Sequence, residues 1–358
     1  MAPAELIDQR VEDRPQAPED RGREDEEGHR RGGDDDPALV DVREQPREHA
    51  ASSRPTLAPL AASRRAAPAL TRSVRASLDS GWHQSPALRS GIEGGNTVTA
   101  PPVHPFEVND AYTHCGLSKY YPYETLRGTL DEAGVTRVTI VQHMGEYDNS
   151  YLAGVIRDNP DTVAGVCLVN HRDPRARDQL EEIALAGDFK GVRLTSEMIF
   201  ERPELLMAAA HLGLIIQAMP HHAPAYWVPY LEAAITRYPG TRVMLSHLAT
   251  PRLQDAPDFA PQQPVWELAR HEGVWFQVSF PSRYAPYPHE PVYPVIAQAF
   301  EAFGPQRIVW GSNYPASGDL AEYLADLNLL LDGRLPVPDD AIEAIAGVNM
   351  RRFWFGQD

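Results

Sequence analysis

Histidines at the ends of apolar runs are the residues of this sequence best suited to chemistry. The first such run ends in NDAYTH, in which Tyr112 and His114 are two positions apart. Side chains two positions apart on an extended strand point to the same face, so both can reach one bound group. Imidazole activates water as a general base, and in its neutral form it binds metal ions. The pair therefore predicts hydrolytic or metal-assisted chemistry at a strand end.

Further polar side chains close later apolar runs in the same way. They are Gln142, His143, Arg193, His221, His222, His247 and Asn313. One histidine at a strand end is more often a hydrogen-bonded structural residue than a catalytic one. Histidines at or beside the ends of several different runs favour a shared functional site.

The elements that would position these residues alternate along the chain. The apolar, β-rich runs cover residues 107–114, 137–143, 163–169, 189–194, 212–219, 241–247, 273–280 and 307–312. Segments with helical spacing cover residues 123–134, 149–159, 174–186, 203–212, 223–238, 264–271, 292–303 and 318–331. Apolar strands that alternate with helices indicate a parallel sheet covered by helices.

Eight such units in residues 99–358 predict an α/β protein with a (β/α)8 TIM barrel, whose typical length is about 250 residues. The alternative is an open doubly wound sheet, but no G-x-G-x-x-G follows the first run. Active sites of TIM barrels lie at the carboxyl ends of the strands. The polar residues above are therefore expected to meet at one face of the barrel.

Residues 1–98 differ in composition from the rest of the chain. They are rich in arginine and acidic residues, contain no lysine and show no hydrophobic periodicity. Such a segment cannot bury enough apolar surface to offset the entropy of ordering, so we predict a disordered, low-complexity tail. The arginine bias of the chain, with lysine only at Lys119 and Lys190, raises a second interpretation: residues 1–98 precede the true translation start and are not part of the native protein.

Charge and composition exclude several classes of partner. A formal net charge of -17 disfavours nucleic acid, because the phosphate backbone repels an acidic surface. No run approaches the roughly 20 apolar residues of a membrane span, and the N-terminus lacks the pattern of a signal peptide. Cys115 and Cys167 have no zinc or disulfide spacing. We expect a cytoplasmic protein that acts on a small molecule, with no nucleic-acid or membrane partner and with homo-oligomerisation left open.

Several motifs match those of one family in order and spacing. NDAYTH is similar to D-x-H-x-H, TRVMLSHLATP to a strand-six histidine segment, and RIVWGSNYP to W-G-S-D-x-P, while VQHMGEYDNSYL, GVRL and VNMRRFWF also match. From about Pro105 onward the chain thus resembles the amidohydrolase-related family, which includes dicarboxylate lactonases, fuconolactone hydrolases and aminocarboxymuconate semialdehyde decarboxylase. The resemblance implies a TIM barrel whose metal is bound by two histidines on strand one, one histidine each on strands five and six, and an aspartate on strand eight.

Two of the implied ligand positions carry other residues. Tyr112 replaces the first histidine and Asn313 replaces the aspartate. A phenol binds a metal only after losing its proton, and an amide cannot take a proton from an attacking water. On strand five the family order would place the ligand at Met219, with His221 and His222 just beyond. Strand parity favours His221, and the resemblance to fuconolactone hydrolases favours His222.

We therefore expect no bound cofactor. The alternative is zinc or another divalent metal on three imidazoles, those of His114, His222 and His247, because three neutral histidines hold zinc in carbonic anhydrase.

The predicted function is hydrolysis of a lactone-like C–O bond in a carboxylated or cyclic small molecule. His247 is expected to be the base, with hydrogen bonds from Asn313 and Tyr112 to the oxyanion. Arg193 is expected to orient a substrate carboxylate. The complete catalytic set is His247, His114, Asn313 and Tyr112, and the substrate-binding set is Arg193, Gln142, His221 and His222.

Two other functions stay open. Asn313 favours a decarboxylase or a cyclase or isomerase on the same scaffold, because no water attacks in those reactions. Both lost ligands also favour a non-catalytic barrel that binds a small molecule.

Two local features complete the predictions. Asn149 precedes a helical segment and is expected to cap it. The stretch PSRYAPYPHEPVYP at residues 281–294, which contains His289, fits either an aromatic lid over the site or a solvent-facing loop.

Overall fold

The computed structural model describes residues 102–280 and 285–357. Eight parallel strands in these residues are hydrogen-bonded in the order β1 to β8. They are β1 (Val108–Thr113), β2 (Val135–Val141), β3 (Val163–Cys167), β4 (Gly191–Thr195), β5 (Ile215–Met219), β6 (Val243–Leu245), β7 (Val274–Val278) and β8 (Ile308–Trp310). The predicted TIM barrel is therefore confirmed. The tail predicted for residues 1–98 lies outside the described residues.

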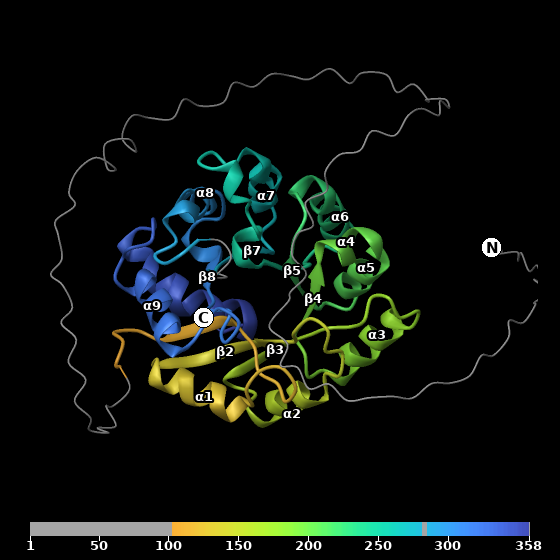
Figure 1. The fold of residues 1–358 in the computed structure, drawn as a ribbon. Coiled ribbons are helices and arrows are strands. Elements are labelled where there is room, and N and C mark those ends of the chain that lie inside the picture. The colour runs from red at the N-terminus through yellow and green to blue at the C-terminus, as the bar shows by residue number, and fades with distance from the viewer. Residues whose placement is uncertain (1–101, 281–284, 358) are drawn as a thin grey trace, which may run out of the picture. The chain divides into compact units, whose positions relative to one another are not determined.

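The α-helices surround the strands (Figure 1). They are α1 (Tyr123–Glu132), α2 (Ser150–Asp158), α3 (Ala176–Ala186), α4 (Ser196–Glu201), α5 (Pro203–His211), α6 (Pro224–Arg237), α7 (Gln263–Glu267), α8 (Tyr293–Phe303) and α9 (Leu320–Leu331). Each predicted helical segment overlaps one of them, and α7 begins one residue before its predicted segment. Only α4 was not predicted, because six residues are too few to display helical periodicity.

The barrel closes where the segment after β8 runs beside β1. The backbone N–H of Asn313 donates to the carbonyl oxygen of Tyr112 at 2.8 Å, and the N–H of His114 donates to that of Tyr314, also at 2.8 Å. These bonds continue the parallel ladder past the end of β8. They also bring the candidate residues of strands one and eight next to each other.

A fully buried carboxyl group, that of Asp110, links this seam to the helical layer. Its Oδ1 accepts the backbone N–H groups of Tyr112 at 3.0 Å and Ser312 at 2.9 Å, and its Oδ2 accepts the hydroxyl of Tyr323 on α9 at 3.1 Å. Burial raises the pKa of Asp110 to about 6, and the hydrogen bonds act in the opposite direction. One carboxyl group thus joins β1, the segment after β8 and α9 by hydrogen bonds.

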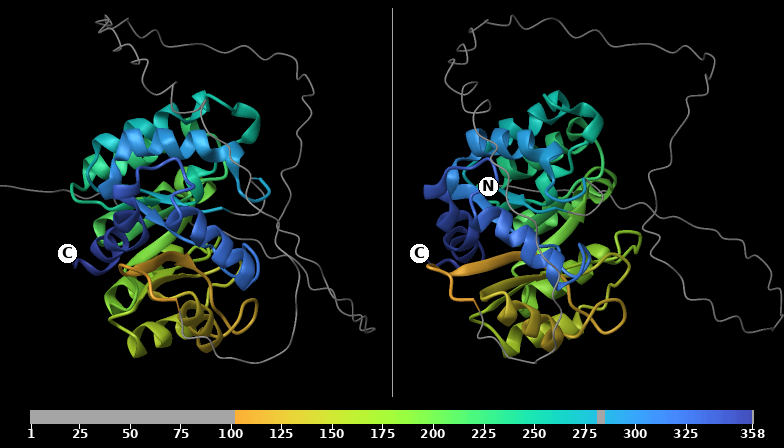
Figure 2. Two further views of the ribbon diagram at one scale, coloured as in Figure 1. Left: turned by 90° about the vertical axis from the view of Figure 1, so that its left-hand side faces the viewer. Right: turned by 60° about the vertical axis from the view of Figure 1, so that its left-hand side comes forward.

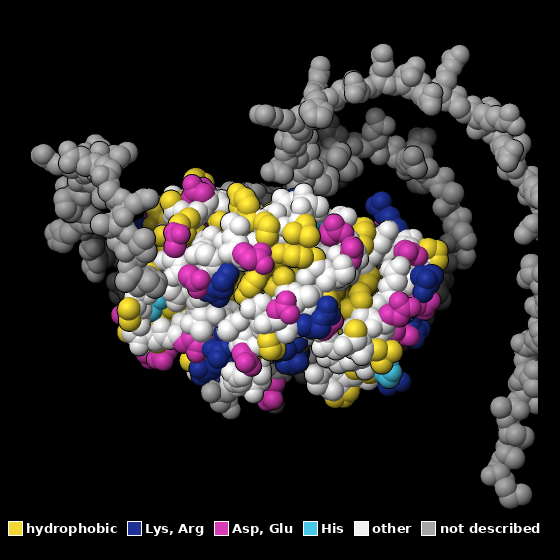
Figure 3. Space-filling view, turned by 90° about the horizontal axis from the view of Figure 1, so that it is seen from below, with side chains coloured by type: hydrophobic (Ala, Val, Ile, Leu, Met, Phe, Trp, Pro, Cys, Tyr) yellow, Lys and Arg dark blue, Asp and Glu magenta, His cyan; other side chains and the backbone are white. Residues whose placement is uncertain are grey.

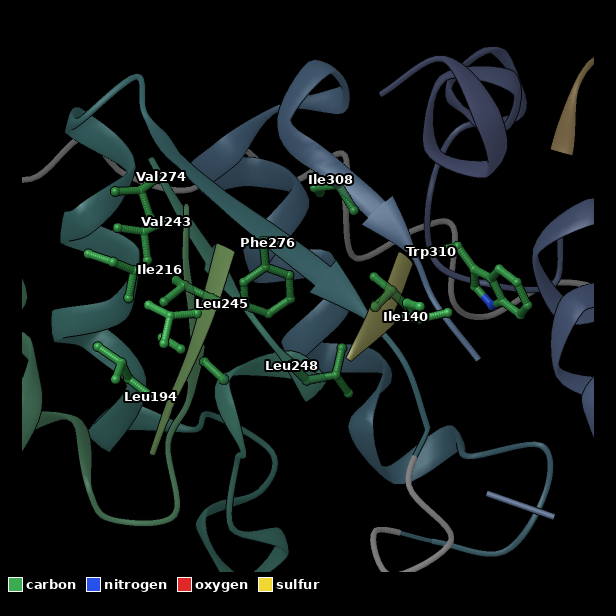
Figure 4. Packing of buried hydrophobic residues seen from close by; sticks show 14 of the residues in the cluster. Ile140, Leu194, Ile216, Val243, Leu245, Leu248, Val274, Phe276, Ile308 and Trp310 are labelled. Atoms are coloured by element: carbon green, nitrogen blue, oxygen red, sulfur yellow. The ribbon is translucent and has the colours of Figure 1, made fainter. Parts of the chain in front are cut away.

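Alternation along the strands decides which side chains enter the barrel. Outward-facing residues pack against the helices, and Figure 4 shows part of this core, including Ile140, Leu194, Ile216, Phe276 and Trp310. Because Val192 and Leu194 both belong to this outer core, Arg193 between them points inward. By the same alternation Met219 points inward from β5.

The C-terminal segment packs beside the start of β1. Figure 2 shows it next to the strand in both views, and the side-chain amide of Asn109 donates to the carbonyl oxygen of Gly347 at 3.1 Å. A side chain at Gly347 would collide with the carbonyl oxygen of Glu107. Phe353 and Trp354 are buried among residues of the barrel interior. The segment therefore closes the barrel at the end opposite the candidate site.

The outer surface is of mixed character. Figure 3, which views the molecule from the side of α1 and α2, shows acidic and basic side chains interspersed around a group of hydrophobic ones. None of the helices in residues 102–280 and 285–357 is long and apolar enough to cross a membrane.

Candidate active site

Three buried rings form the centre of the barrel mouth. The ring of Tyr112 lies between two imidazoles, with centroid distances of 5.3 Å to His114 and 4.5 Å to His247, and both contacts are edge-on. All three side chains are buried. The structure thus brings together three of the four predicted catalytic side chains, from strands one and six.

The loop after β1 adds a fourth ring that the sequence did not single out. Tyr120 stacks on His114 with a centroid distance of 4.9 Å and an angle of 11°, and its edge meets His143 at 5.3 Å. The only signal in the sequence is an aromatic residue shortly after the strand-one histidine. Strand ends alone do not indicate Tyr120, since it lies in the loop after β1. Tyr120 forms a wall of the mouth on the side of β1 and β2.

Arg193 brings a permanent positive charge into the mouth. Its Nη1 donates to the carbonyl oxygen of Gln142 at 3.0 Å, and its Nη2 lies 2.7 Å from the sulfur of Met219. The hydroxyl of Tyr112 points to the same sulfur at 3.7 Å. Met219 occupies the strand-five position where the family order places a metal ligand. Here it contacts a guanidinium group and a phenol.

His114 is held as a neutral ring of one tautomer. Its Nδ1 lies 2.7 Å from the carbonyl oxygen of Val141, which only accepts, so Nδ1 carries the hydrogen. Burial, and then the charge of Arg193, lowers the pKa of His114 to about 3. The ring therefore stays uncharged near neutral pH and is a weak base.

His247 is placed by a strained backbone and by a hydroxyl group. Residues His247 to Thr250 all have positive φ, between 52° and 57°. Left-handed conformation costs non-glycine residues roughly 1–2 kcal/mol each, and strain of this kind concentrates at functional sites. Nδ1 of His247 lies 2.7 Å from the hydroxyl oxygen of Ser279, at the end of β7. Ser279 was not predicted as a site residue.

Asn313 also has a left-handed backbone, with a φ of 60°. Asparagine adopts this conformation more readily than most residues. Among the described residues the buried acids are Asp110 and Asp326, and Asp326 binds His289 at 3.0 Å. The mouth thus has no buried carboxylate among the described residues that could act as a base.

The two histidines after strand five lie at the rim. Nδ1 of His222 is 2.9 Å from the hydroxyl oxygen of Ser196, at the start of α4, and its ring contacts Phe200 and Tyr226. The same hydroxyl oxygen accepts the backbone N–H of His221 at 2.9 Å. These contacts direct His222 to α4 and α6, away from the three central rings.

Two polar residues after β2 have structural partners. The side chain of Gln142 donates to the carbonyl oxygen of Asp148 at 2.9 Å and accepts the N–H of His143 at 3.0 Å. Asn149 does not cap α2 through its side chain, so that prediction is wrong. Its side-chain amide instead donates to the carbonyl oxygen of Leu168 at 2.9 Å and accepts the backbone N–H of Leu168 at 3.1 Å. These two bonds join the loop after β2 to the end of β3.

The stretch at residues 281–294, expected to be either an aromatic lid or a solvent-facing loop, is described only in part, because residues 281–284 lie outside the described residues. His289 is buried, with Nδ1 2.8 Å from the carbonyl oxygen of Ala285 and Nε2 3.0 Å from Asp326 on α9. Its ring stacks on Phe280 at 4.5 Å. These contacts anchor His289 to the barrel wall.

A surface groove of about 520 Å³ lies beside α2 and α3. Apolar side chains such as Ala153, Ile183 and Phe189 line it, together with Asp173 and Glu182. None of the predicted catalytic residues is among its lining residues. The groove is therefore separate from the barrel mouth, where the histidines gather.

The side chains present at the mouth do not fit a divalent metal. Of the positions that the resemblance implies, Tyr112 and Met219 are engaged with each other, and the charge of Arg193 acts on His114. A second cation beside this guanidinium would be repelled. No three histidine, cysteine, aspartate or glutamate side chains in residues 102–280 and 285–357 are grouped to hold a metal ion.

The fold and the mouth together define an enzyme-type TIM barrel with a histidine-rich site at the carboxyl ends of its strands. An amidohydrolase family model matches residues 104–356, and the chain belongs to the amidohydrolase family. The predicted family is thereby confirmed, and the predicted hydrolase class is supported.

Individual relatives show how far the similarity extends. L-fucono-1,5-lactonase of Burkholderia ambifaria is 28% identical over 221 residues, which cover 56% of this chain and 74% of the relative. Two solved structures share the fold. One is a proposed 2-pyrone-4,6-dicarboxylic acid hydrolase from Pseudomonas putida, with a TM-score of 0.56, 19% identity, and coverage of 72% of this chain and 100% of the other. The other is a zinc-bound amidohydrolase from Burkholderia multivorans, with a TM-score of 0.57, 16% identity, and coverage of 70% and 99%.

Proposed function

We propose that this protein hydrolyses the C–O bond of a carboxylated, lactone-like small molecule without a resident metal ion. The observation that carries the proposal is the buried guanidinium of Arg193, which lies in the same mouth as the rings of Tyr112 and His247. The lactonase name of the Burkholderia ambifaria relative supports the choice of bond.

The proposed reaction assigns the base to His247. A water oxygen attacks the carbonyl carbon of the lactone while a water proton passes to Nε2 of His247, since Nδ1 faces Ser279. His114 is a poor candidate for this role because its pKa is about 3. When the ring C–O bond breaks, the same proton moves from His247 to the departing alkoxide oxygen.

Charge stabilisation falls to donors that need no metal. The hydroxyl of Tyr112, which contacts the sulfur of Met219 at 3.7 Å, is the proposed first donor to a developing oxyanion. Arg193 keeps N–H groups beyond those that bond Gln142 and Met219, and they would bind anionic substrate oxygens. Asn313, which adjoins Tyr112 through the backbone, is the proposed second donor.

The test is turnover of a panel of carboxylated and sugar-acid lactones by the full chain, before and after dialysis against a chelator. We expect a chelator-resistant rate that falls at least about 100-fold in His247→Ala and in Arg193→Met. An exposed matched variant, Arg175→Met, should retain the rate, since its side chain is 65% exposed on the surface. Loss of the rate on chelation with recovery on adding zinc would contradict the metal-free reaction.

A decarboxylase is the second candidate, and the observation that favours it is Asn313. Removal of carbon dioxide from a carboxylated substrate does not require a base to activate water, so the amide of Asn313 is compatible with this reaction. Release of carbon dioxide without ring opening would distinguish this reaction.

The remaining expectations are also proposals. We propose a cytoplasmic location and no nucleic-acid partner, and homo-oligomerisation stays open. Small-molecule chemistry is in keeping with the names of the relatives.

A further inference from the structure

A buried pair of side chains, His289 and Asp326, joins the segment after β7 to α9. Nε2 of the imidazole lies 3.0 Å from Oδ1 of Asp326, and Nδ1 lies 2.8 Å from the carbonyl oxygen of Ala285. Because that carbonyl oxygen only accepts, Nδ1 carries a hydrogen, and Nε2 shares another with the carboxyl group. Hydrogen bonds at both nitrogens therefore fix the orientation of the ring.

The fixed ring holds the end of β7 from outside the barrel. It stacks on Phe280 with a centroid distance of 4.5 Å and an angle of 4°. Because Val278 and Phe280 both belong to the outer core, Ser279 between them points the other way, into the barrel. The hydroxyl oxygen of Ser279 lies there 2.7 Å from Nδ1 of His247. The end of β7 thus carries the His289 contact on one face and the His247 contact on the other.

The same face of α9 supports the other side of the mouth. Tyr323 and Asp326 are three positions apart on this helix and therefore project from one face. The hydroxyl of Tyr323 donates to the carboxyl group of Asp110, which also accepts the backbone N–H of Tyr112. One helix face thus braces the strand that carries Tyr112 and, through Asp326, the end of β7.

We propose that His289, held by Asp326, is a positioning residue for His247. Its ring keeps Phe280 in one orientation, and this places the Ser279 hydroxyl against Nδ1 of His247 and directs Nε2 to the attacking water. A small displacement of a catalytic group costs a large factor in rate, so a support behind the strand end affects the reaction without touching the substrate. The kinetic part of the inference rests on the proposed function, in which His247 is the base.

The state of the His247 ring can be measured without turnover. Imidazole nitrogen NMR spectra of the full chain, with the His247 signals identified by their loss in His247→Ala, show which ring nitrogen carries the hydrogen. We expect one tautomer in wild type and in Asp326→Asn, whose amide can still bond His289, and a mixture of both tautomers in Asp326→Leu. The control His211→Phe replaces an exposed histidine that contacts Tyr238 and should match wild type. A single tautomer in Asp326→Leu would overturn the proposal.

Kinetics test whether the effect passes through Ser279. On a lactone that the protein opens, Asp326→Leu should lower kcat about tenfold, change KM less than about twofold and displace the acidic limb of the pH-rate profile. Asp326→Asn should restore the rate and the profile. In a Ser279→Ala background, Asp326→Leu should have little further effect, because the contact that it positions is already absent. An equal loss in both backgrounds, which general destabilisation would produce, would contradict the positioning role.

The positioning role and the proposed function fail separately. If Asp326→Leu mixes the His247 tautomers but no lactone is opened by wild type, the positioning role holds and the hydrolase proposal fails. If a lactone is opened and neither the tautomer nor kcat responds to Asp326→Leu, the hydrolase proposal holds and the positioning role is wrong.

Discussion

Replacement of Asp110 by asparagine should change how the stability of the barrel depends on pH. The pKa of this carboxyl group is about 6 in the folded protein, against 3.8 for an ordinary aspartate. Because one unit of pKa difference corresponds to about 1.4 kcal/mol, the ionised group costs the folded state about 3 kcal/mol. The stabilisation is fully present below pH 3.8 and is lost as the pH rises through about 6.

The Asp110→Asn variant keeps the shape of the site but not the charge. Its amide oxygen can still accept from Tyr112 and Ser312, and its NH2 group can donate to the hydroxyl of Tyr323 once that hydroxyl turns. Between pH 4 and pH 7.5, wild type should therefore lose about 2.5 kcal/mol more unfolding free energy than the variant.

Urea unfolding followed by tryptophan fluorescence at a series of pH values measures this difference. Asp131→Asn is the control, because the side chain of Asp131 is 66% exposed and pairs with Arg127 at the surface. Its pH dependence should match that of wild type. If Asp110→Asn also matched wild type across this range, the raised pKa, and with it the cost assigned to the seam carboxylate, would be refuted.

Three further predictions follow from other parts of the chain. Ser279→Ala removes the hydroxyl beside Nδ1 of His247 and should lower kcat/KM about tenfold and displace the acidic limb of the pH-rate profile, which reports the base, while Ser279→Thr restores both. An unchanged profile would deny the contact a role. Zinc content measured by elemental analysis should be close to zero in wild type and about one equivalent in the combined variant Tyr112→His, Met219→His, Asn313→Asp. Stoichiometric zinc in wild type would contradict the conclusion that the side chains of the mouth do not fit a divalent metal ion. Gly347→Ala should destabilise the protein by about 1–3 kcal/mol, because the added Cβ would collide with the carbonyl oxygen of Glu107. The control Gly154→Ala on α2 should be neutral or stabilising, because nothing lies within 4 Å of the added Cβ. Similar effects of the two variants in urea unfolding would refute the clash.

The fold was predictable from the sequence because hydrophobic patterning acts locally. Each strand appears as a short apolar run and each long helix as a periodic segment, so the order of elements alone selects the barrel. The prediction for Asn149 failed for a related reason. Its helix-capping role is a local preference, whereas its actual bonds to Leu168 depend on a neighbouring strand.

The candidate site was predictable only in part. Tyr112, His114 and His247 meet as strand position implies, because strand ends converge in a barrel. The contact of Arg193 with Met219 joins two inward-facing side chains, and nothing in the spacing of either residue indicates it. The contact of His222 with Ser196 was not predictable either, since a few residues beyond the end of β5 the chain has turned toward α4.

Backbone conformation gives evidence for His247 that is independent of family resemblance. His247, Leu248, Ala249 and Thr250 are consecutive, none is glycine, and all have positive φ. At roughly 1–2 kcal/mol each, this turn costs several kcal/mol, which is a large part of the 5–15 kcal/mol that typically stabilises a folded protein. Such strain persists only where the surrounding structure enforces it, here with the buried hydroxyl of Ser279 against the imidazole. A turn that served only to connect β6 to the next helix could use glycine and avoid the cost. The observed turn instead directs the His247 ring against Tyr112, at the place where the proposed base must stand.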